Sequence, residues 1–513
     1  MGVTDSKGDV IGSKTDMNGG GWNIPVYSAL KAYGDSNPLP FHMPGHKLGN
    51  GIPRELLSEI EKLDLTEIPG TDNLHAPTGV IKEAQGLAAE AFGAVESFFL
   101  VNGSTVGLHA AIAAVCRRGQ TLITGRDSHR AVINGMQICG VSPFYILPEY
   151  SQIFGIHTGF TPQTVEKALQ DVPDAVGLLI TRPNYYGVCS ELTQIAEIVH
   201  KHNKILIVDE AHGAHLTFNS RLPESALACG ADLCIQSAHK TLPAFTQGAY
   251  LHVGSDRIDR ERIAHFLDLF QTTSPSYVIM AYLDIARELM QRFGRKRLDS
   301  LLDNIEACSS RFDLGGIELM NHSLVPGFDH DATRITANVS ATGVTGYAAE
   351  KLLREKSNIQ VEMSDLRNIV CIATVADDCG SVEKLFSAMS RLGEELAQQA
   401  AERPDEGIGG LAGLDSKSIL MNDAKLADYR RLALPDLAME PWEILESKIE
   451  KIPLTRAQGR ISGAIISPYP PGIAIVCPGE SFSPDIVRYL MDISRAGGVV
   501  NGVDEDGAVA VIR

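Results

Sequence analysis

The fold class follows from residues 175–211, which read AVGLLITRPNYYGVCSELTQIAEIVHKHNKILIVDEA. AVGLLITRP (175–183) and KILIVDEA (204–211) are short, nearly continuous apolar runs, and each has the length of a buried strand. ELTQIAEIVHKHN (191–203) lies between them and carries apolar residues at helical spacing. Two such strands joined by a helix indicate a parallel sheet that helices cover on both faces.

The same alternation extends outward, from about residue 85 to about residue 255. Further strands are expected at SFFLVNG (97–103), QTLITG (120–125), VSPFYIL (141–147), ADLCIQ (231–236) and AYLHV (249–253). Further helices are expected at STVGLHAAIAAVCRRG (104–119), HRAVINGMQICG (129–140) and TPQTVEKALQDVP (161–173). Ligands of such sheets bind at the carboxyl ends of the strands. We therefore expect the chemistry of the protein within this region.

Composition and spacing also predict how the chain is divided. A long helical stretch, YLDIARELMQRFGRKRLDSLLDNIEACSSRF (282–312), is expected to connect a large α/β domain with a smaller one, and ERPDEGIGGLAGLD (402–415) has the Gly, Pro and acidic residues of a linker. The predicted parts are a disordered segment (1–24), an N-terminal arm with the large domain (25–295), a small α/β domain (296–401), a linker (402–417) and a C-terminal segment (418–513).

The overall composition describes a soluble globular protein. The 513 residues are 44% hydrophobic and 21% charged, and the formal net charge of −18 argues against a general nucleic-acid partner. The nine cysteines include no CxxC pair, which predicts reduced thiols and a cytoplasmic location. The sequence starts with no basic-then-apolar segment and contains no apolar stretch near 18 residues, so neither export nor a membrane partner is expected.

Lys240 stands out because it lies in SAHKTL (237–242), between two apolar runs. Burial disfavours an ammonium and leaves a neutral amine that can attack a carbonyl carbon. A structural lysine in an ion pair is the more common outcome, so the neighbouring residues must decide. Asp209 ends the run KILIVDEA, at the same expected edge of the sheet.

Asp209 has other possible interpretations. It could be a helix cap, a magnesium ligand or part of a helicase DEAH box, but the chain lacks the phosphate loop GxxxxGK[ST] that a helicase requires. His212 and His215 do not have a strong zinc spacing, and no metal site is expected.

A phosphate site is expected where LVNGSTVGLHAAI (100–112) passes from a strand into a helix that opens with Ser104 and Thr105. His129 follows another strand at the same edge. A phosphate cradle, a carboxylate, a ring partner and a reactive lysine together match pyridoxal phosphate. In this interpretation Asp209 holds the pyridine nitrogen, His129 lies over the ring and Lys240 binds the aldehyde carbon. The phosphate would contact Ser104, Thr105 and His239.

Six further motifs resemble one family, the ornithine/lysine/arginine decarboxylases. They are PFHMPGHKLG (40–49), DNLHAPTGVIKEAQ (72–85), DEAHGAHL (209–216), SAHKTL (237–242), TTSPSY (272–277) and GRISGAIISPYPPGIAIVCPGE (459–480). The resemblance implies the pyridoxal-phosphate-dependent transferase fold type I of aspartate aminotransferase, with a mostly parallel seven-stranded sheet. It also implies a cofactor-binding large domain and a C-terminal decarboxylase domain. The length is similar to that of the short bacterial biosynthetic arginine decarboxylases. The usual PTY stretch of the family is PNYYG (183–187) here, with Asn184 in place of Thr.

The resemblance also implies roles for individual residues. Ala211 would pack on the second ring face of the cofactor, His212 would lie near its phenolic oxygen, and Ser237 would also contact the cofactor. Ser274 would reach the phosphate of a partner subunit, which implies a homodimer or a higher homo-oligomer with shared active sites. Glu480 is the leading candidate to bind the distal cation of the substrate, ahead of a second acidic turn at Asp504, Glu505 and Asp506.

The implied reaction is decarboxylation of a basic L-amino acid in polyamine biosynthesis. Arginine, giving agmatine and CO₂, is the preferred substrate, with lysine and ornithine as alternatives. An aminotransferase or an oxidase on the same scaffold remains open, because Arg334 or Arg367 could fix an α-carboxylate. A non-catalytic binding protein would be expected to lose cofactor residues, and this chain retains Lys240, Asp209 and His129.

Overall fold

The computed structural model describes residues 24–58, 60–402, 433–469, 472–495 and 499–513. The predicted disorder of residues 1–23 and all but the first residue of the predicted linker (402–417) lie outside these ranges. The chain divides into two units, residues 1–39 and residues 40–513. The first unit contributes helix α1 (Pro25–Asp35), which begins with a proline, a residue well suited to a first helical turn.

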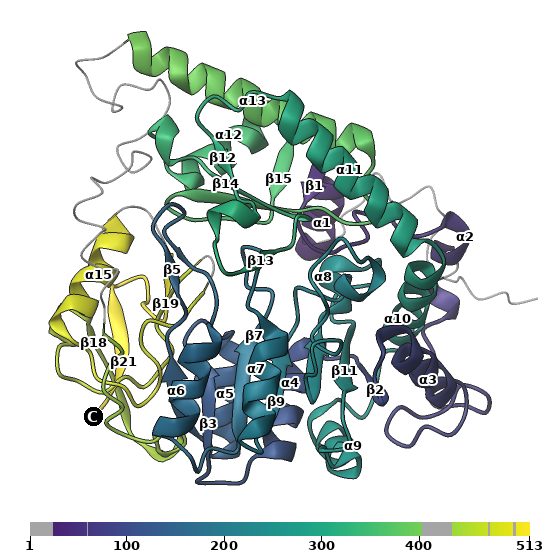
Figure 1. Cartoon of the computed structure of the whole chain (residues 1–513), viewed down its shortest axis with the longest axis vertical. Coiled ribbons are helices and arrows are strands. Elements are labelled where there is room, and N and C mark those ends of the chain that lie inside the picture. Colours follow the sequence, from purple (N-terminus) through teal and green to yellow (C-terminus); the bar gives the residue numbers. More distant parts are fainter. Residues whose placement is uncertain (1–23, 59, 403–432, 470–471, 496–498) are drawn as a thin grey trace, which may run out of the picture. The chain divides into compact units, whose positions relative to one another are not determined.

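The central element of the second unit is a seven-stranded sheet with the order β2-β11-β10-β9-β7-β3-β4 (Figure 1). The strands β10, β9, β7, β3 and β4 pair in parallel, whereas β11 is antiparallel to both of its neighbours. The predicted mostly parallel sheet of seven strands is therefore confirmed. Its strands are β2 (Glu96–Leu100), β3 (Thr121–Gly125), β4 (Ser142–Ile146), β7 (Gly177–Thr181), β9 (Ile205–Asp209), β10 (Leu233–Gln236) and β11 (Ala249–Val253).

Helices cover both faces of this sheet, which explains why its strands are apolar at nearly every position. Leu179 and Ile207 belong to one hydrophobic core, together with residues of α4, α5 and α9. Their chain neighbours Leu178 and Leu206 point the other way, into a second core with residues of α6 and α7. The helices are α4 (Gly103–Val115), α5 (Arg130–Cys139), α6 (Pro162–Asp171), α7 (Leu192–Lys201) and α9 (Arg260–Phe270). Thr161 caps α6, since its side chain accepts a hydrogen bond from the Thr164 backbone.

A long helical segment leads from this sheet to a second one. It consists of α10 (Tyr277–Leu289), a π-helical turn (Met290–Gly294) and α11 (Arg295–Arg311), in agreement with the predicted helical stretch. The second sheet has the order β12-β14-β17-β16, and all of its pairs are antiparallel. Its elements are β12 (Glu318–Leu319), β14 (Arg334–Asn338), β16 (Met363–Ser364) and β17 (Asn368–Ile372), with α12 (Gly346–Ser357) and α13 (Cys379–Glu402). The predicted domain boundaries stay predictions.

The C-terminal part has a small core of its own. Buried side chains of α15 (Pro484–Arg495), among them Leu490, pack with Val500 and Val509. The strands pair as β18 (Ile449–Pro453) with β21 (Ala508–Ile512), and β19 (Ser467–Tyr469) with β20 (Val499–Asn501).

The remaining elements are short, apart from α3 (Val80–Phe92). The short strands are β1 (Leu39–Phe41), β5 (Tyr150–Ser151), β6 (Ile156–His157), β8 (Val188–Cys189), β13 (Asp329–His330) and β15 (Ile359–Val361), and the short α-helices are α2 (Arg54–Leu57) and α8 (Ala238–Thr241). The 3₁₀ helices, labelled η, are η2 (Ile60–Lys62), η3 (Leu216–Phe218), η5 (His322–Leu324), η6 (Ser340–Thr342), η10 (Glu443–Glu446) and η11 (Leu454–Arg456). Within the ranges that the model describes, no helix combines the length and the apolar character that a membrane span needs.

Candidate active site

The predicted site residues follow the carboxyl ends of strands that run in the same direction. Asp209 is the last residue of β9, and Lys240 lies in the short helix α8, which follows β10 directly. His129 is the N-cap of α5 after β3, and Ser104 lies in the first turn of α4 after β2. The sheet therefore places these four residues at one edge, as the alternation of strands and helices predicts.

The lysine amine contacts a histidine that in turn contacts an arginine. Lys240 Nζ lies 3.1 Å from His212 Nε2, and Arg334 Nη2 lies 2.9 Å from His212 Nδ1. The Tyr185 ring lies beside both groups, with its centroid 5.9 Å from Lys240 Nζ and 4.6 Å from the His212 ring centroid. Burial lowers the pKa of Lys240, and the charge of Asp209 opposes this shift. The amine can therefore become uncharged more easily than an exposed lysine.

Asp209 is a buried carboxylate, and its Oδ1 accepts a hydrogen bond of 3.1 Å from the Ala211 backbone. Burial raises its pKa, while the positive charge of Lys240 and the Ala211 bond oppose this shift. A buried carboxylate of this kind gains stability from a positively charged partner. Asp209 can therefore hold a cationic ring nitrogen.

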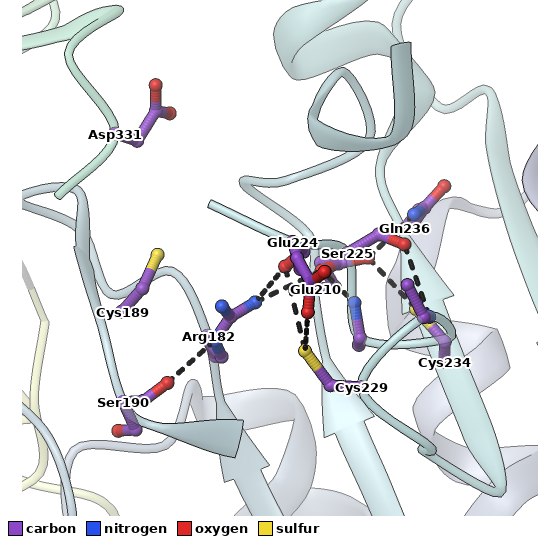
Figure 2. A network of polar contacts seen from close by, with 12 residues as sticks. Arg182, Cys189, Ser190, Glu210, Glu224, Ser225, Cys229, Cys234, Gln236 and Asp331 are labelled. Carbon is purple, nitrogen blue, oxygen red and sulfur yellow. Dashed lines mark hydrogen bonds and ion pairs between the residues drawn. The ribbon is translucent and has the colours of Figure 1, made fainter. Parts of the chain in front are cut away.

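The neighbouring Glu210 has a different, structural role (Figure 2). Its carboxylate accepts hydrogen bonds from Gln236 Nε2 at 2.7 Å, from the Ala226 backbone at 2.7 Å and from Cys234 Sγ at 3.2 Å. Arg182 lies 3.8 Å away as an ion partner and also donates to the backbone carbonyl of Glu224. This network fixes the end of β9, so that Asp209, the residue before Glu210, is held in place.

Hydroxyl and backbone donors meet where α4 begins. Ser237 Oγ donates to Ser104 Oγ at 2.8 Å, which brings the end of β10 next to the first turn of α4. The N-cap residue Asn102 makes no side-chain capping bond, and its Oδ1 accepts from the Thr272 backbone instead. The first N–H groups of this 13-residue helix are thus left without that cap and can bind an anion. The Thr105 side chain is exposed at the same turn.

The two other predicted histidines are held as neutral rings. The Nδ1 of His129 accepts a hydrogen bond of 3.2 Å from the Ala131 backbone, and burial and then the charge of Lys240 lower its pKa to about 4. The Nδ1 of His239 lies 3.1 Å from the Gly248 carbonyl oxygen, and burial lowers its pKa to about 4. Uncharged imidazoles can stack on a ring or donate one N–H without repelling Lys240.

The structure does not support Glu480 as a free carboxylate for the substrate. Its Oε1 and Oε2 accept from Arg126 Nη1 at 2.6 Å and from Nη2 at 2.7 Å, and Oε2 also accepts from the Cys477 backbone. Both side chains are buried, with Glu480 only 1% exposed. Glu480 stays a prediction as a substrate contact, although an internal ion pair already uses its charge. The second candidate, Asp504, pairs with Lys451 at 2.9 Å on the surface.

Asn184, the departure from the family pattern, has a backbone-binding role. Its Nδ2 donates to the carbonyls of His157 and Thr158, and its Oδ1 accepts from the backbones of Tyr186 and Val188. These four bonds shape the turn that carries Tyr185. A threonine hydroxyl has one donor hydrogen and could not make both donor bonds.

Sequence reasoning missed Tyr185, Asp127 and Glu362, and it named Arg334 only as a possible partner of an α-carboxylate. Tyr185 lies beside Lys240, and Arg334 is joined to Lys240 through His212. Asp127 is buried with its Oδ1 unpaired among the described residues, and burial raises its pKa to about 7, with a smaller effect from Asp209. Glu362 accepts from the Met43 backbone at 2.9 Å, and its charge raises the pKa of Lys240. Tyr185 lies in the PNYYG stretch, which gave no sign of this role, and Arg334 and Glu362 come from the second sheet region.

The structure also shows the surroundings of three other residues named from the sequence, Ala211, Ser274 and His215. Ala211 is buried directly after the Asp209–Glu210 pair, and Ser274 is exposed beside Thr272. His215 bonds to Thr333 and pairs with Asp331 at 3.1 Å. In the part of the chain that the model describes, no group of three or more His, Cys, Asp and Glu side chains is arranged to hold a metal ion.

Comparisons with known proteins show the family to which this chain belongs. Two family models match the chain: Orn/Lys/Arg decarboxylase, major domain, over residues 24–325, and Orn/Lys/Arg decarboxylase, C-terminal domain, over residues 424–506. The arginine decarboxylase of Bacillus subtilis (strain 168) is 34% identical over 497 residues, which cover 95% of this chain and 97% of that protein. The lysine decarboxylase LdcA of Pseudomonas aeruginosa is 24% identical, and the alignment covers 91% of this chain and 75% of that protein.

Solved structures confirm the predicted fold type. The lysine decarboxylase LdcF of Francisella novicida superimposes with a TM-score of 0.74 at 20% identity, over 92% of this chain and 78% of that chain. The L-threonine transaldolase of Pseudomonas fluorescens has the same fold, with a TM-score of 0.56 at 16% identity, over 79% of this chain and 96% of that chain. The family models cover more than half of the sequence, and the Bacillus relative aligns over nearly its whole length. The resemblance predicted from the motifs is thereby confirmed: the chain belongs to the Orn/Lys/Arg decarboxylase family and is a decarboxylase of basic amino acids.

Proposed function

We propose that this protein binds pyridoxal phosphate and converts L-arginine to agmatine and CO₂. The observation that carries the proposal is the position of the Lys240 amine. It contacts His212, and the charge of the buried Asp209 raises its pKa against the effect of burial. We prefer arginine to lysine as the substrate because the Bacillus subtilis relative, which aligns over 97% of its own length, is an arginine decarboxylase. The lysine decarboxylase LdcA is less similar to this chain and is longer.

The side chains present fit pyridoxal phosphate. Lys240 provides a buried amine for the aldehyde carbon, and Asp209 provides a buried carboxylate for the pyridine nitrogen. The Ser104 and Ser237 hydroxyls and the uncapped start of α4 suit the phosphate, with Thr105 and His239 close by in the chain. His129 and Ala211 would face the two sides of the ring. When bound, the cofactor would accept the electron pair that CO₂ leaves behind.

The residues around Lys240 would move the protons of the reaction. After CO₂ leaves, a proton must return to the Cα atom of the substrate. Lys240 Nζ and His212 Nε2 are 3.1 Å apart, so a proton that one group donates can be replaced from the other. Tyr185, whose ring lies beside both groups, would help to exclude water from them.

Glu362 is our candidate for binding the distal guanidinium of the substrate. It is only partly buried, and one carboxylate oxygen, Oε2, accepts from the Met43 backbone. Its charge acts on both Lys240 and Arg334, so it lies near the reactive amine. A carboxylate is the partner that best matches a planar guanidinium. Glu362 thus replaces Glu480 in this role.

The protein would act in the cytoplasm as a homodimer or a higher homo-oligomer and contribute to polyamine biosynthesis. All nine cysteines are free thiols, which suits a reducing compartment. Ser274 is exposed, as expected for a residue that reaches the phosphate in a partner subunit. Agmatine carries two basic groups and can serve as a precursor of polyamines.

The direct test is incubation of the purified chain with pyridoxal phosphate and, separately, with arginine, lysine and ornithine. We expect a visible absorption band of the lysine-bound cofactor, and CO₂ with agmatine from arginine. The Lys240→Ala variant should lose both signals, whereas Lys451→Ala, which changes an exposed lysine, should keep both. Cadaverine or putrescine as the main product would reassign the substrate. A keto acid without CO₂ would favour an aminotransferase.

A further inference from the structure

We infer that Arg334 is a positioning residue: it fixes the tautomer of His212, so that His212 donates to Lys240 and keeps its amine uncharged for capture of the cofactor. The inference rests on the proposed cofactor. It assigns to Arg334 a role different from a clamp for the substrate carboxylate.

The three residues form a continuous buried chain. Arg334 is the first residue of β14 in the second sheet, and it is 1% exposed. Its Nη2 lies 2.9 Å from Nδ1 of His212, which is 2% exposed. On the other side of the ring, His212 Nε2 lies 3.1 Å from Lys240 Nζ.

Donor and acceptor chemistry allows one arrangement of hydrogens along this chain. A guanidinium can only donate hydrogen bonds, so His212 Nδ1 must accept from Arg334. A neutral imidazole with an accepting Nδ1 carries its hydrogen on Nε2. His212 is held neutral, because burial lowers its pKa well below the usual value and the charge of Arg334 adds to this effect. The Nε2–H therefore donates to Lys240, and only an uncharged amine has the lone pair to accept it.

The surrounding backbone holds Arg334 in this position. Gly187 has a φ of +87°, and a Cβ atom built on it would lie 2.7 Å from the Cβ of Arg334. The turn that carries Tyr185 therefore passes directly over the Arg334 side chain, and any larger residue at 187 would displace one of them. The charge of Asp331 favours the charged form of Arg334, and Thr333 and His215 hold Asp331 in turn.

Several other charges act on the Lys240 amine and set the background for a pH experiment. Asp209 and Glu362 favour its charged form, whereas burial and Arg334 favour the neutral form. The titratable or charged groups that interact with it include Asp209, Glu362, Arg334, Tyr185, His212, His129 and His239. Arg334 is distinguished within this group because it acts along a hydrogen-bonded path as well as through its charge.

The consequence concerns loading of the cofactor. When Lys240 captures the aldehyde, its nitrogen forms a bond to the carbonyl carbon, the amine gives up its protons, and the carbonyl oxygen leaves as one water. The attack requires the lone pair of the amine. The rate of capture should therefore follow the fraction of uncharged Lys240 and rise with pH. Without Arg334, this profile should move to higher pH.

The test measures how fast the cofactor-free chain develops the visible absorption band after pyridoxal phosphate is added, as a function of pH. For Arg334→Met we expect the midpoint to rise by one unit or more, so that capture is about tenfold or more slower at neutral pH and recovers at high pH. Arg334→Lys retains a charged donor and should largely restore the wild-type profile. Arg354→Met is the matched control, since Arg354 is an exposed residue of helix α12 that pairs with Glu350 in the same sheet region.

A double-mutant cycle separates the hydrogen-bonded path from a simple charge effect. In a His212→Phe background, Arg334→Met should cause a clearly smaller shift than in the wild type, because only the direct effect of its charge on Lys240 remains. A full shift in that background would overturn the inference. An unchanged pH profile of cofactor capture in Arg334→Met, combined with a raised KM for arginine, would also overturn the inference and would make Arg334 a clamp for the substrate carboxylate.

If Arg334→Met does not fold, Arg334→Lys still tests the inference. A large shift of its capture profile, despite the retained donor and charge, would contradict the inference. Failure of the wild-type chain to capture the cofactor would instead reject the proposed function.

Discussion

The carboxylate of Glu480 forms a buried, bidentate ion pair with the guanidinium of Arg126. Nη1 lies 2.6 Å from Oε1, and Nη2 lies 2.7 Å from Oε2. Arg126 directly follows β3 and precedes His129 by three residues. It also donates to the carbonyls of Ala474 and Ile475. The pair thus joins the C-terminal segment to the loop that carries a site residue, although the two partners are 354 positions apart in the sequence.

This relationship predicts that Glu480→Gln acts on stability first. Removing one partner of a buried pair leaves an uncompensated charge, at a cost of about 3–5 kcal/mol in the free energy of unfolding. Denaturant unfolding of the cofactor-free chain measures this loss. Asp504→Asn, which removes one partner of an exposed pair with Lys451, should change stability little. A normal stability together with a strongly raised KM for arginine would instead return Glu480 to the substrate.

Asp209→Asn should separate cofactor binding from catalysis. The amide has nearly the same shape, so capture of pyridoxal phosphate by Lys240 should persist and the absorption band should remain. It has no negative charge to hold a protonated ring nitrogen, so we expect kcat to fall by roughly a hundredfold or more. Steady-state release of CO₂ from arginine measures the effect. A kcat within a few-fold of the wild type would show that Asp209 does not face the ring nitrogen.

The neutral state of His129 predicts a dependence of stability on pH. Its pKa in the folded protein is about 4, below the ordinary value of 6.5, because of burial and the charge of Lys240. Between these values the unfolded chain binds a proton that the folded chain does not bind. The free energy of unfolding should therefore be fully retained above pH 6.5 and decrease as the pH falls towards 4.

His129→Asn tests this effect with the helix cap retained. Asparagine is a good N-cap, so α5 should keep its first turn while the titrating group is removed. Denaturant unfolding of the cofactor-free variant between pH 4 and pH 7 should show a smaller slope than the wild type. His322→Asn, at an exposed position, should leave the slope unchanged. An unaltered slope in His129→Asn would mean that other buried groups carry the whole dependence.

Glu362→Gln should weaken binding of arginine. Loss of a hydrogen bond to a charged group costs about 1.5–3 kcal/mol, so we expect KM for arginine to rise roughly ten- to a hundredfold. Capture of the cofactor should still occur, since Lys240 and Asp209 are unchanged. Glu355→Gln, at an exposed position of the preceding helix α12, is the matched control. An unaltered KM combined with a shifted capture profile would make Glu362 a counter-charge of Lys240 only.

The sequence by itself determined the elements of the large sheet and where along it several proposed site residues lie. Apolar runs and helical spacing are local properties, and they placed Asp209 at the end of one strand and Lys240 shortly after another, as in the structure. The tertiary structure decided the direction of β11. This strand runs antiparallel to both of its neighbours, β10 and β2, although its apolar sequence resembles theirs.

Packing also decided which polar and charged side chains contact one another. Arg334 and His212 are 122 positions apart, and Arg126 and Glu480 are 354 apart, so neither contact leaves a local pattern in the sequence. An acidic residue in a specific motif, Glu480, therefore suggested a substrate contact, although its charge is compensated internally. Desolvation makes a buried charge depend on its partner, and only the folded chain shows which partner lies within hydrogen-bonding distance.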